Sequence, residues 1–287
     1  MTLPDKRLHA YRSDLADVRL KGRVEADRFV AGTPMCIIRP VLDMLAGPSR
    51  QSGLNTQIVR GASVAVFEEK DGLAWVQAGD DGYVGYVEAE GLGAVEARAS
   101  THVVHAPRTF LYAEPDMKKH RVETLSIGSR VDVVGETETR GTRYALLSSG
   151  EAAIAAHLRP LSEPASDWVG VAETLEHTPY LWGGASAFGI DCSGLVQLAM
   201  RMAGRSAPRD SDMQAAGIGS VVEPGADLAS LERGDLVFWK GHVAIVTGPD
   251  RIIHANGHTM SVARESLSGA VARIGYLYGQ PTGFRRP

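Results

Sequence analysis

The chain has 287 residues, of which 44% are hydrophobic and 22% charged, with a formal net charge of −4 and a pI near 6.1. This is the profile of a soluble globular protein, long enough for one large domain or for two to three small ones. The chain carries no basic stripe, which excludes nucleic acid as an expected partner, and no run of about 18 apolar residues, which excludes an expected membrane-spanning helix.

The first 30 residues are predicted to be a polar lead-in with some helical character. Their charges are spread throughout, and no apolar core of a secretory signal is found among them. Two cysteines, Cys36 and Cys192, lie far apart in the sequence. Without an export signal, reduced thiols are favoured over a disulfide, so we expect a cytoplasmic protein.

Residues 31–97 and 98–162 are predicted to form two small SH3-like β-barrels. Short alternating runs in both segments are broken by Gly, Pro, Asp and Ser, as expected for strands and tight turns. About sixty residues of such strands suit an SH3-like barrel. A weak internal repeat at an offset of 67 residues (128 − 61) favours two copies, since it aligns Gly61, Val64 and Val66 with Gly128, Val131 and Val133.

A Pro/Ser-rich stretch over 158–168 ends the β-rich part, and a third domain is predicted for residues 163–287. In this domain helical patterns come first and strands follow, without the alternation that a parallel sheet requires. We therefore predict an α+β fold, with a helix packed on an antiparallel sheet, preceded by the two barrels.

Cys192 lies at the predicted start of a helix, where Asp191 or Ser193 can serve as the N-cap. The positive end of the helix favours a thiolate and predicts a lowered pKa for Cys192, and its free N–H groups could stabilise an oxyanion. Taken alone, the residue is more typical of a buried structural cysteine. The helix is indicated by apolar residues at the i, i+3, i+4, i+7 spacing, namely Leu195, Leu198, Ala199 and Met202.

Two of the nine histidines are placed by a predicted hairpin, "GHVAIVTGPDRIIHAN". A tight turn centred near residue 248 puts His242 directly opposite His254, on one face of the ladder. One imidazole can act as general base for a thiol, and the second can hold the first in the right tautomer. Structural roles are the alternative, with His242 capping a strand and His254 buried in the core.

A cysteine with two histidines could also bind zinc. The short spacings of zinc ligands are missing, and only His258 offers a fourth ligand. No metal and no cofactor is therefore expected.

At this point an ordered series of motifs resembles a known family. The stretches "TPYLWGGASAFGIDCSGLVQLAM", "PRDSDMQ", "LERGDLVFW", "GHVAIVTG" and "IIHANG" are similar to the catalytic domain of NlpC-type, papain-like cysteine peptidases of bacterial cell-wall peptides, over about 165–285. The resemblance implies that Cys192 is the nucleophile, His242 the base and His254 the residue that orients it. It places Tyr180 beside the thiol, where it helps the oxyanion; packing of an amphipathic ring is the alternative.

With the two barrels, the chain resembles the γ-D-glutamyl-L-diamino acid endopeptidases, also called dipeptidyl-peptidase VI-like enzymes. The resemblance implies cleavage after D-Glu in murein stem peptides with a free N-terminal L-Ala, the third residue being diaminopimelate or lysine, in cytoplasmic peptidoglycan recycling. It assigns the substrate amine to Asp191. A helix cap is the alternative for this carboxylate, and the two roles can coexist.

Further substrate contacts implied by the resemblance fall on Ser193, Ser211 and a tyrosine of the first barrel. Tyr83 in "DGYVGYV" is the candidate, and Tyr86 is its rival. An acidic partner from the same barrel is not found, since Asn55 stands where a glutamate is expected.

Two other function classes stay open. One is a non-catalytic cell-wall-binding protein, against which the cysteine and both histidines argue. The other is a different acyl-transfer enzyme, an amidase or a lipid-directed acyltransferase, against which the barrels and Asp191 argue.

Overall fold

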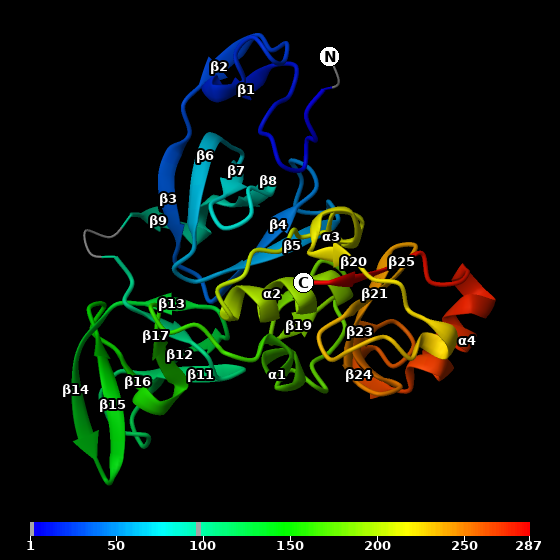
Figure 1. Cartoon of the computed structure of the whole chain (residues 1–287). Coiled ribbons are helices and arrows are strands. Elements are labelled where there is room, and N and C mark those ends of the chain that lie inside the picture. Colours follow the sequence, from blue (N-terminus) through cyan, green and yellow to red (C-terminus); the bar gives the residue numbers. More distant parts are fainter. Residues whose placement is uncertain (1–2, 96–98) are drawn as a thin grey trace. The chain divides into compact units, whose positions relative to one another are not determined.

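The computed structural model describes residues 3–95 and 99–287 and divides the chain into two compact units, Met1–Glu163 and Pro164–Pro287 (Figure 1). The division lies within one residue of the predicted start of the third domain. The boundary predicted between the two barrels, at 97/98, falls outside the described residues. Within the described ranges no helix is both long and apolar enough to cross a membrane.

The lead-in contains one helical turn and two short strands, so its predicted helical character is met only by that turn in residues 3–30. The elements are β1 (Leu15–Asp17), the 3-10 helix η1 (Val18–Leu20) and β2 (Arg28–Val30), with β1 parallel to β2. The segment packs on the following domain, where the Arg12 guanidinium lies 4.4 Å from the centre of the Trp75 ring and pairs with Glu68 at 2.6 Å. A cation–π contact and an ion pair therefore hold the lead-in on the first β domain.

The first β domain is one sheet of seven antiparallel strands in the order β5-β4-β8-β7-β6-β3-β9. Alternate residues such as Leu42 and Met44 are buried in its core, as the period of two predicts. The strands are β3 (Thr33–Ile37), β4 (Val41–Leu45), β5 (Leu54–Val59), β6 (Ser63–Lys70), β7 (Leu73–Ala78), β8 (Val84–Glu88) and β9 (Leu92–Ala94), with η2 at Ala89–Gly91.

The second β domain repeats this connectivity in two sheets, β12-β11-β16-β15-β14 and β13-β10-β17. Its order is that of the first domain with one strand interrupted between β13 and β14. The elements are β10 (His102–Val104), β11 (Arg108–Tyr112), β12 (Arg121–Ser126), β13 (Arg130–Val131), β14 (Val133–Thr139), β15 (Thr142–Leu147), β16 (Ala152–Ile154), η3 (Ala155–His157) and β17 (Leu158–Pro160).

The predicted repeat is confirmed at one turn of each β domain. The Gly61 N–H donates to the Ile37 carbonyl, and the Gly128 N–H to the Val104 carbonyl, both at 2.9 Å. Both glycines have positive φ, 81° and 87°. The same backbone turn therefore recurs 67 residues later (128 − 61 and 104 − 37).

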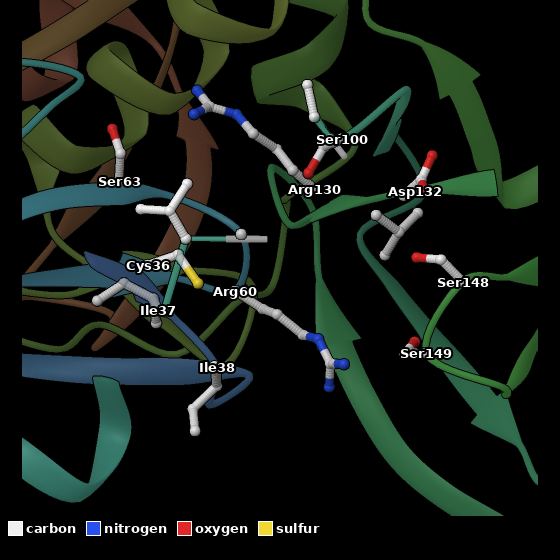
Figure 2. A pocket seen from close by; sticks show the side chains of 14 residues that line it. Cys36, Ile37, Ile38, Arg60, Ser63, Ser100, Arg130, Asp132, Ser148 and Ser149 are labelled. Atoms are coloured by element: carbon white, nitrogen blue, oxygen red, sulfur yellow. The ribbon is translucent and has the colours of Figure 1, made fainter. Parts of the chain in front are cut away.

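Residues of both β domains line a cavity of about 180 Å³ within the first unit (Figure 2). Beside it the Arg130 N–H donates to the Arg60 carbonyl at 2.9 Å. The two guanidinium groups are paired with acids of the other domain, Arg60 with Glu123 at 2.5 Å and Arg130 with Asp80 at 2.8 Å. These contacts join the two domains and neutralise the cationic lining.

The second unit combines four helices with an antiparallel sheet over its described residues, which confirms the α+β prediction. Its antiparallel sheet has the order β20-β25-β21-β22-β23-β24. Helix α2 contacts α1, β22 and β23, and α4 shares a core with β21, β22 and β23. The elements are α1 (Trp168–Glu173), β18 (Ala185–Ser186), β19 (Gly189–Ile190), α2 (Cys192–Met202), α3 (Ser211–Gly217), β20 (Ser220–Val221), η4 (Ala226–Leu228), β21 (Leu236–Trp239), β22 (His242–Gly248), β23 (Arg251–Asn256), β24 (Ser261–Glu265), α4 (Leu267–Tyr278) and β25 (Gly283–Arg286).

Gly61→Ala is expected to destabilise the protein more than Gly141→Ala. Both glycines have positive φ, so each alanine costs about 1–2 kcal/mol in backbone strain. A Cβ at 61 would also lie 2.5 Å from the Arg130 carbonyl oxygen, whereas a Cβ at 141 meets nothing within 4 Å. Urea denaturation followed by tryptophan fluorescence measures both variants, and equal losses would contradict a tight junction between the β domains.

Candidate active site

Cys192 is the first residue of α2, which confirms its predicted place at a helix start. The Asp191 carboxylate caps the helix by accepting the Gly194 N–H at 2.7 Å. The thiol is 7% exposed, and its sulfur accepts hydrogen bonds from the backbone N–H groups of Val243 and Ser193. The thiol therefore lies beside the first residues of β22, where His242 stands.

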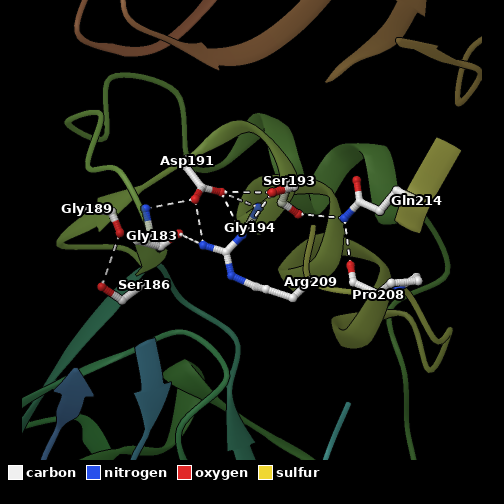
Figure 3. A network of polar contacts seen from close by, with 10 residues as sticks. Gly183, Ser186, Gly189, Asp191, Ser193, Gly194, Pro208, Arg209 and Gln214 are labelled. Atoms are coloured by element: carbon white, nitrogen blue, oxygen red, sulfur yellow. Dashed lines mark hydrogen bonds and ion pairs between the residues drawn. The ribbon is translucent and has the colours of Figure 1, made fainter. Parts of the chain in front are cut away.

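Asp191 is the centre of a buried polar network (Figure 3). The Arg209 guanidinium, 1% exposed, binds it in a bidentate pair with Nη2–Oδ2 at 2.6 Å and Nη1–Oδ1 at 3.0 Å. The Gly183 N–H donates to Oδ2 at 2.9 Å. The Ser193 hydroxyl donates to Oδ1 at 3.2 Å and accepts from Arg209 at 2.9 Å. One carboxylate thus ties the loop before α2, the start of α2 and the segment before α3 together.

This geometry is the helix cap considered as the alternative for Asp191. The predicted contact with the substrate amine can coexist with the cap and stays a prediction. Arg209 already neutralises the charge, and the backbone N–H groups take up the remaining lone pairs. The same network occupies the Ser193 hydroxyl, whose predicted contact with substrate stays a prediction.

The two histidines are in contact as predicted, although the register of their hairpin differs. His242 Nε2 lies 2.8 Å from His254 Nδ1. The ladder pairs Ile245 with Ile253, so by continuation His254 lies opposite residue 244 rather than 242. The turn is the two-residue Pro249–Asp250, centred later than the predicted turn. Because the shift is two residues, both histidines stay on one face and meet diagonally.

Beyond His254 the chain of contacts continues to two residues that the sequence reasoning missed. His254 Nε2 lies 2.7 Å from Glu265 Oε1, and Glu265 forms an ion pair with Arg273 of α4. Glu265 ends β24, where it lies opposite Ile252 and therefore on the same face as His254. Extending the hairpin argument to the next strand, "SVARE", is the signal that could have found it.

Burial determines the protonation states of Cys192 and His242. The predicted lowering of the pKa of Cys192 is wrong. Burial, with the nearby Asp191 charge, raises the pKa of Cys192 to about 12, although the two backbone N–H groups act in the opposite direction. Burial also lowers the pKa of His242 to about 3. At neutral pH the resting site therefore holds a thiol and a neutral imidazole.

Tyr180 is half-buried. Its phenol interacts electrostatically with Cys192, which indicates that the two side chains lie in the same site. Burial raises the pKa of Tyr180 to about 12, so its hydroxyl stays protonated and is able to donate to an oxyanion.

The remaining predicted contacts lie on other elements. Ser211 is the first residue of α3. Tyr83 belongs to the first unit, where it is 3% exposed and part of the core of the first β domain. Its rival Tyr86 accepts a hydrogen bond from Arg12 at 3.1 Å. Substrate roles for Ser211 and Tyr83 stay predictions.

A zinc site is not supported by the arrangement of the side chains. Among residues 3–95 and 99–287 no three His, Cys, Asp or Glu side chains are grouped so as to hold a metal ion. The nitrogens that join His242 and His254 are used in their mutual hydrogen bond.

Two family models match this chain. Residues 177–276 match the NlpC/P60 family, and residues 44–92 match the bacterial dipeptidyl-peptidase SH3 domain. The first match covers the cysteine, both histidines and Glu265, and the second lies in the first β domain.

Curated relatives match most of this chain at low identity. Dipeptidyl-peptidase 6 of Lysinibacillus sphaericus is 26% identical over 84% of this chain and 98% of its own length. A gamma-D-glutamyl-L-lysine dipeptidyl-peptidase of Bacillus cereus is 27% identical over 70% of this chain and 67% of its own. The crystal structure of an NlpC/P60 family protein from Bacillus cereus superposes with a TM-score of 0.73 at 22% identity, over 88% of this chain and 99% of that one, which shows a shared fold.

Arg209→Met is expected to destabilise the second unit by about 3–5 kcal/mol, because it leaves the Asp191 carboxylate buried without its counter-charge. Arg264→Met is the matched control, since Arg264 pairs with Glu173 and Glu176 at the surface and its loss should cost less than about 1 kcal/mol. Urea denaturation measures both. Equal and small losses would show that the Asp191 network does not anchor α2.

The alkylation rate of Cys192 by iodoacetamide is expected to rise steadily with pH up to about 10, because a thiol with its pKa raised is protonated throughout that range. Cys36→Ser removes the second thiol from the background. Mass spectrometry of the labelled chain gives the rate at each pH. A plateau beginning below about pH 7 would instead indicate a thiolate–imidazolium pair at rest.

Proposed function

Given that this chain carries an NlpC/P60 cysteine peptidase domain and a bacterial dipeptidyl-peptidase SH3 domain, we propose that it hydrolyses the γ-D-glutamyl–diamino acid bond of murein stem peptides with a free N-terminal L-Ala. The observation that carries the proposal is the thiol of Cys192 at the start of α2, beside the hydrogen-bonded pair His242–His254. Such a set performs nucleophilic acyl transfer.

In the first half of the reaction Cys192 Sγ attacks the γ-carbonyl carbon of D-Glu. Because the resting thiol is protonated, His242 removes its proton as the new C–S bond forms. The oxyanion is stabilised by N–H groups at the start of α2 and by the protonated Tyr180 hydroxyl. His242 then donates the proton to the departing amine of the diamino acid, and the C–N bond breaks.

In the second half a water molecule attacks the thioester carbonyl, and His242 accepts a proton from it. The C–S bond breaks, L-Ala-D-Glu leaves as the free acid, and the sulfur takes the proton back from His242. Each half uses the same base, so the hydrogen bond between His242 and His254 has to hold one orientation of His242 through both.

The substrate class is supported by the relatives. The Bacillus cereus relative is named for a γ-D-glutamyl-L-lysine bond, and this chain carries a bacterial dipeptidyl-peptidase SH3 domain before its NlpC/P60 domain. We further infer that the second β domain is a diverged SH3 copy, since it repeats the strand order of the first and its glycine turn. Two cysteines far apart in the sequence suit a reducing compartment, and we propose a cytoplasmic role in peptidoglycan recycling.

Incubation with L-Ala-γ-D-Glu-diaminopimelate and with its N-acetylated twin tests the proposal. We expect mass spectrometry to find L-Ala-D-Glu and free diaminopimelate from the first peptide only, and a loss of at least about 10³-fold in Cys192→Ala. The lysine peptide, run in parallel, identifies the preferred diamino acid.

The other outcomes overturn defined parts of the proposal. Equal cleavage of both peptides would keep the cysteine peptidase and remove the free-amine requirement and the recycling role. If the folded protein cleaves neither peptide, this result would favour an amidase, an acyltransferase or a wall-binding protein. Full turnover by Cys192→Ala would exclude the thiol mechanism.

A further inference from the structure

We propose that Glu265 is a positioning residue that fixes the tautomer of His254 and, through it, that of His242, leaving His242 Nδ1 unprotonated as the nitrogen that serves Cys192. This inference rests on the proposed function only in treating His242 as the base. Arg273 contributes to this arrangement, since its ion pair holds the Glu265 carboxylate in place.

The geometry is a continuous line of hydrogen bonds across three neighbouring strands. His242 of β22 contacts His254 of β23 at 2.8 Å, through Nε2 and Nδ1 respectively. His254 Nε2 then meets Glu265 Oε1 of β24 at 2.7 Å. The side chain of His254 is fully buried, so no solvent molecule replaces either contact.

The tautomers follow from which partner can donate. An ionised carboxylate only accepts, so the proton of His254 has to sit on Nε2. His254 Nδ1 then carries a lone pair, and His242 Nε2 has to donate to it. The proton of neutral His242 is therefore on Nε2, and its Nδ1 is free to act as a base.

The position of the thiol agrees with this assignment. Cys192 is the first residue of α2, His242 is the first residue of β22, and α2 packs against β22. Since Nε2 of His242 is engaged with His254, Nδ1 is the nitrogen that remains for the thiol proton. With the opposite tautomer, His242 Nδ1 would carry a proton and could not accept another.

We call the line of hydrogen bonds from Glu265 through His254 to His242 the relay. It requires that Glu265 stays ionised, because a protonated carboxyl could donate a hydrogen bond to His254 and reverse both tautomers. The hydrogen bond from His254 and the ion pair with Arg273 lower the pKa of Glu265. Glu265 in turn favours the charged form of His242, which His254 and Arg273 disfavour. The carboxylate is thus a partner for the imidazolium that forms during attack, as well as the group that fixes the tautomers.

Nitrogen NMR of the full chain labelled at histidine tests the assignment without any substrate. At neutral pH we expect His242 and His254 both to be protonated at Nε2 and bare at Nδ1, with signals assigned by replacing each histidine in turn. The opposite tautomer at either histidine overturns the proposal, and this measurement needs no variant of Glu265 to fold.

Glu265→Gln keeps the size of the side chain but can either donate or accept. We expect it to mix the tautomers of both histidines and to lower kcat by between about 10-fold and 10⁴-fold, with KM within about threefold of the parent. Glu265→Asp keeps an acceptor-only group and should retain the parent tautomers. Glu176→Gln is the matched control, since Glu176 pairs with Arg264 and contacts neither histidine; it should leave tautomers and kcat unchanged.

The two readouts separate the failure of this inference from that of the proposed function. Unchanged tautomers in a folded Glu265→Gln protein overturn the relay, whatever the rate does. An intact relay by NMR in a protein that cleaves no murein peptide overturns only the proposed substrate. A kcat within about twofold of the parent, with the tautomers mixed, would show that the relay does not serve the base.

Discussion

The buried carboxylate of Asp191 is the constraint on which the catalytic domain depends. It caps α2 through Gly194, binds the loop before the helix through Gly183 and pairs with Arg209 from the segment before α3. The position of Cys192, one residue later, follows from these contacts. Removing either charged partner would leave the other buried, so the pair is stable only as a whole.

Burial of that helix start has an electrostatic consequence that reverses the ordinary expectation for a cysteine at an N-terminus. Helix N–H groups favour a thiolate, but loss of water and the Asp191 carboxylate oppose it, and the pKa of Cys192 is raised. The resting site is uncharged at the thiol and at His242. Proton transfer has to accompany attack, and the orientation and tautomer of the base then matter more than a charge stored in advance.

Features that depend on the local residue pattern, or on which face of a strand a residue occupies, could be predicted from the sequence. Features that depend on tertiary packing could not. The helix at 192 and the contact of the two histidines follow from spacing alone, and a two-residue error in the hairpin left the histidines on one face. The pairing of Asp191 with Arg209, 18 residues away, is a tertiary contact that no periodicity indicates. The sign of the cysteine pKa depends on how deeply the domain buries it, which composition does not reveal.

The two acids in contact with the catalytic residues have one property in common. Asp191 is bound by Arg209 and Glu265 by Arg273, so each holds a fixed position with its charge balanced. An acid that is to bind a substrate ammonium needs its charge unbalanced until the ligand arrives, because burying an ammonium without a partner is costly. The free-amine requirement proposed for this enzyme therefore needs a further acceptor beside Asp191, whose own predicted contact with the amine stays a prediction.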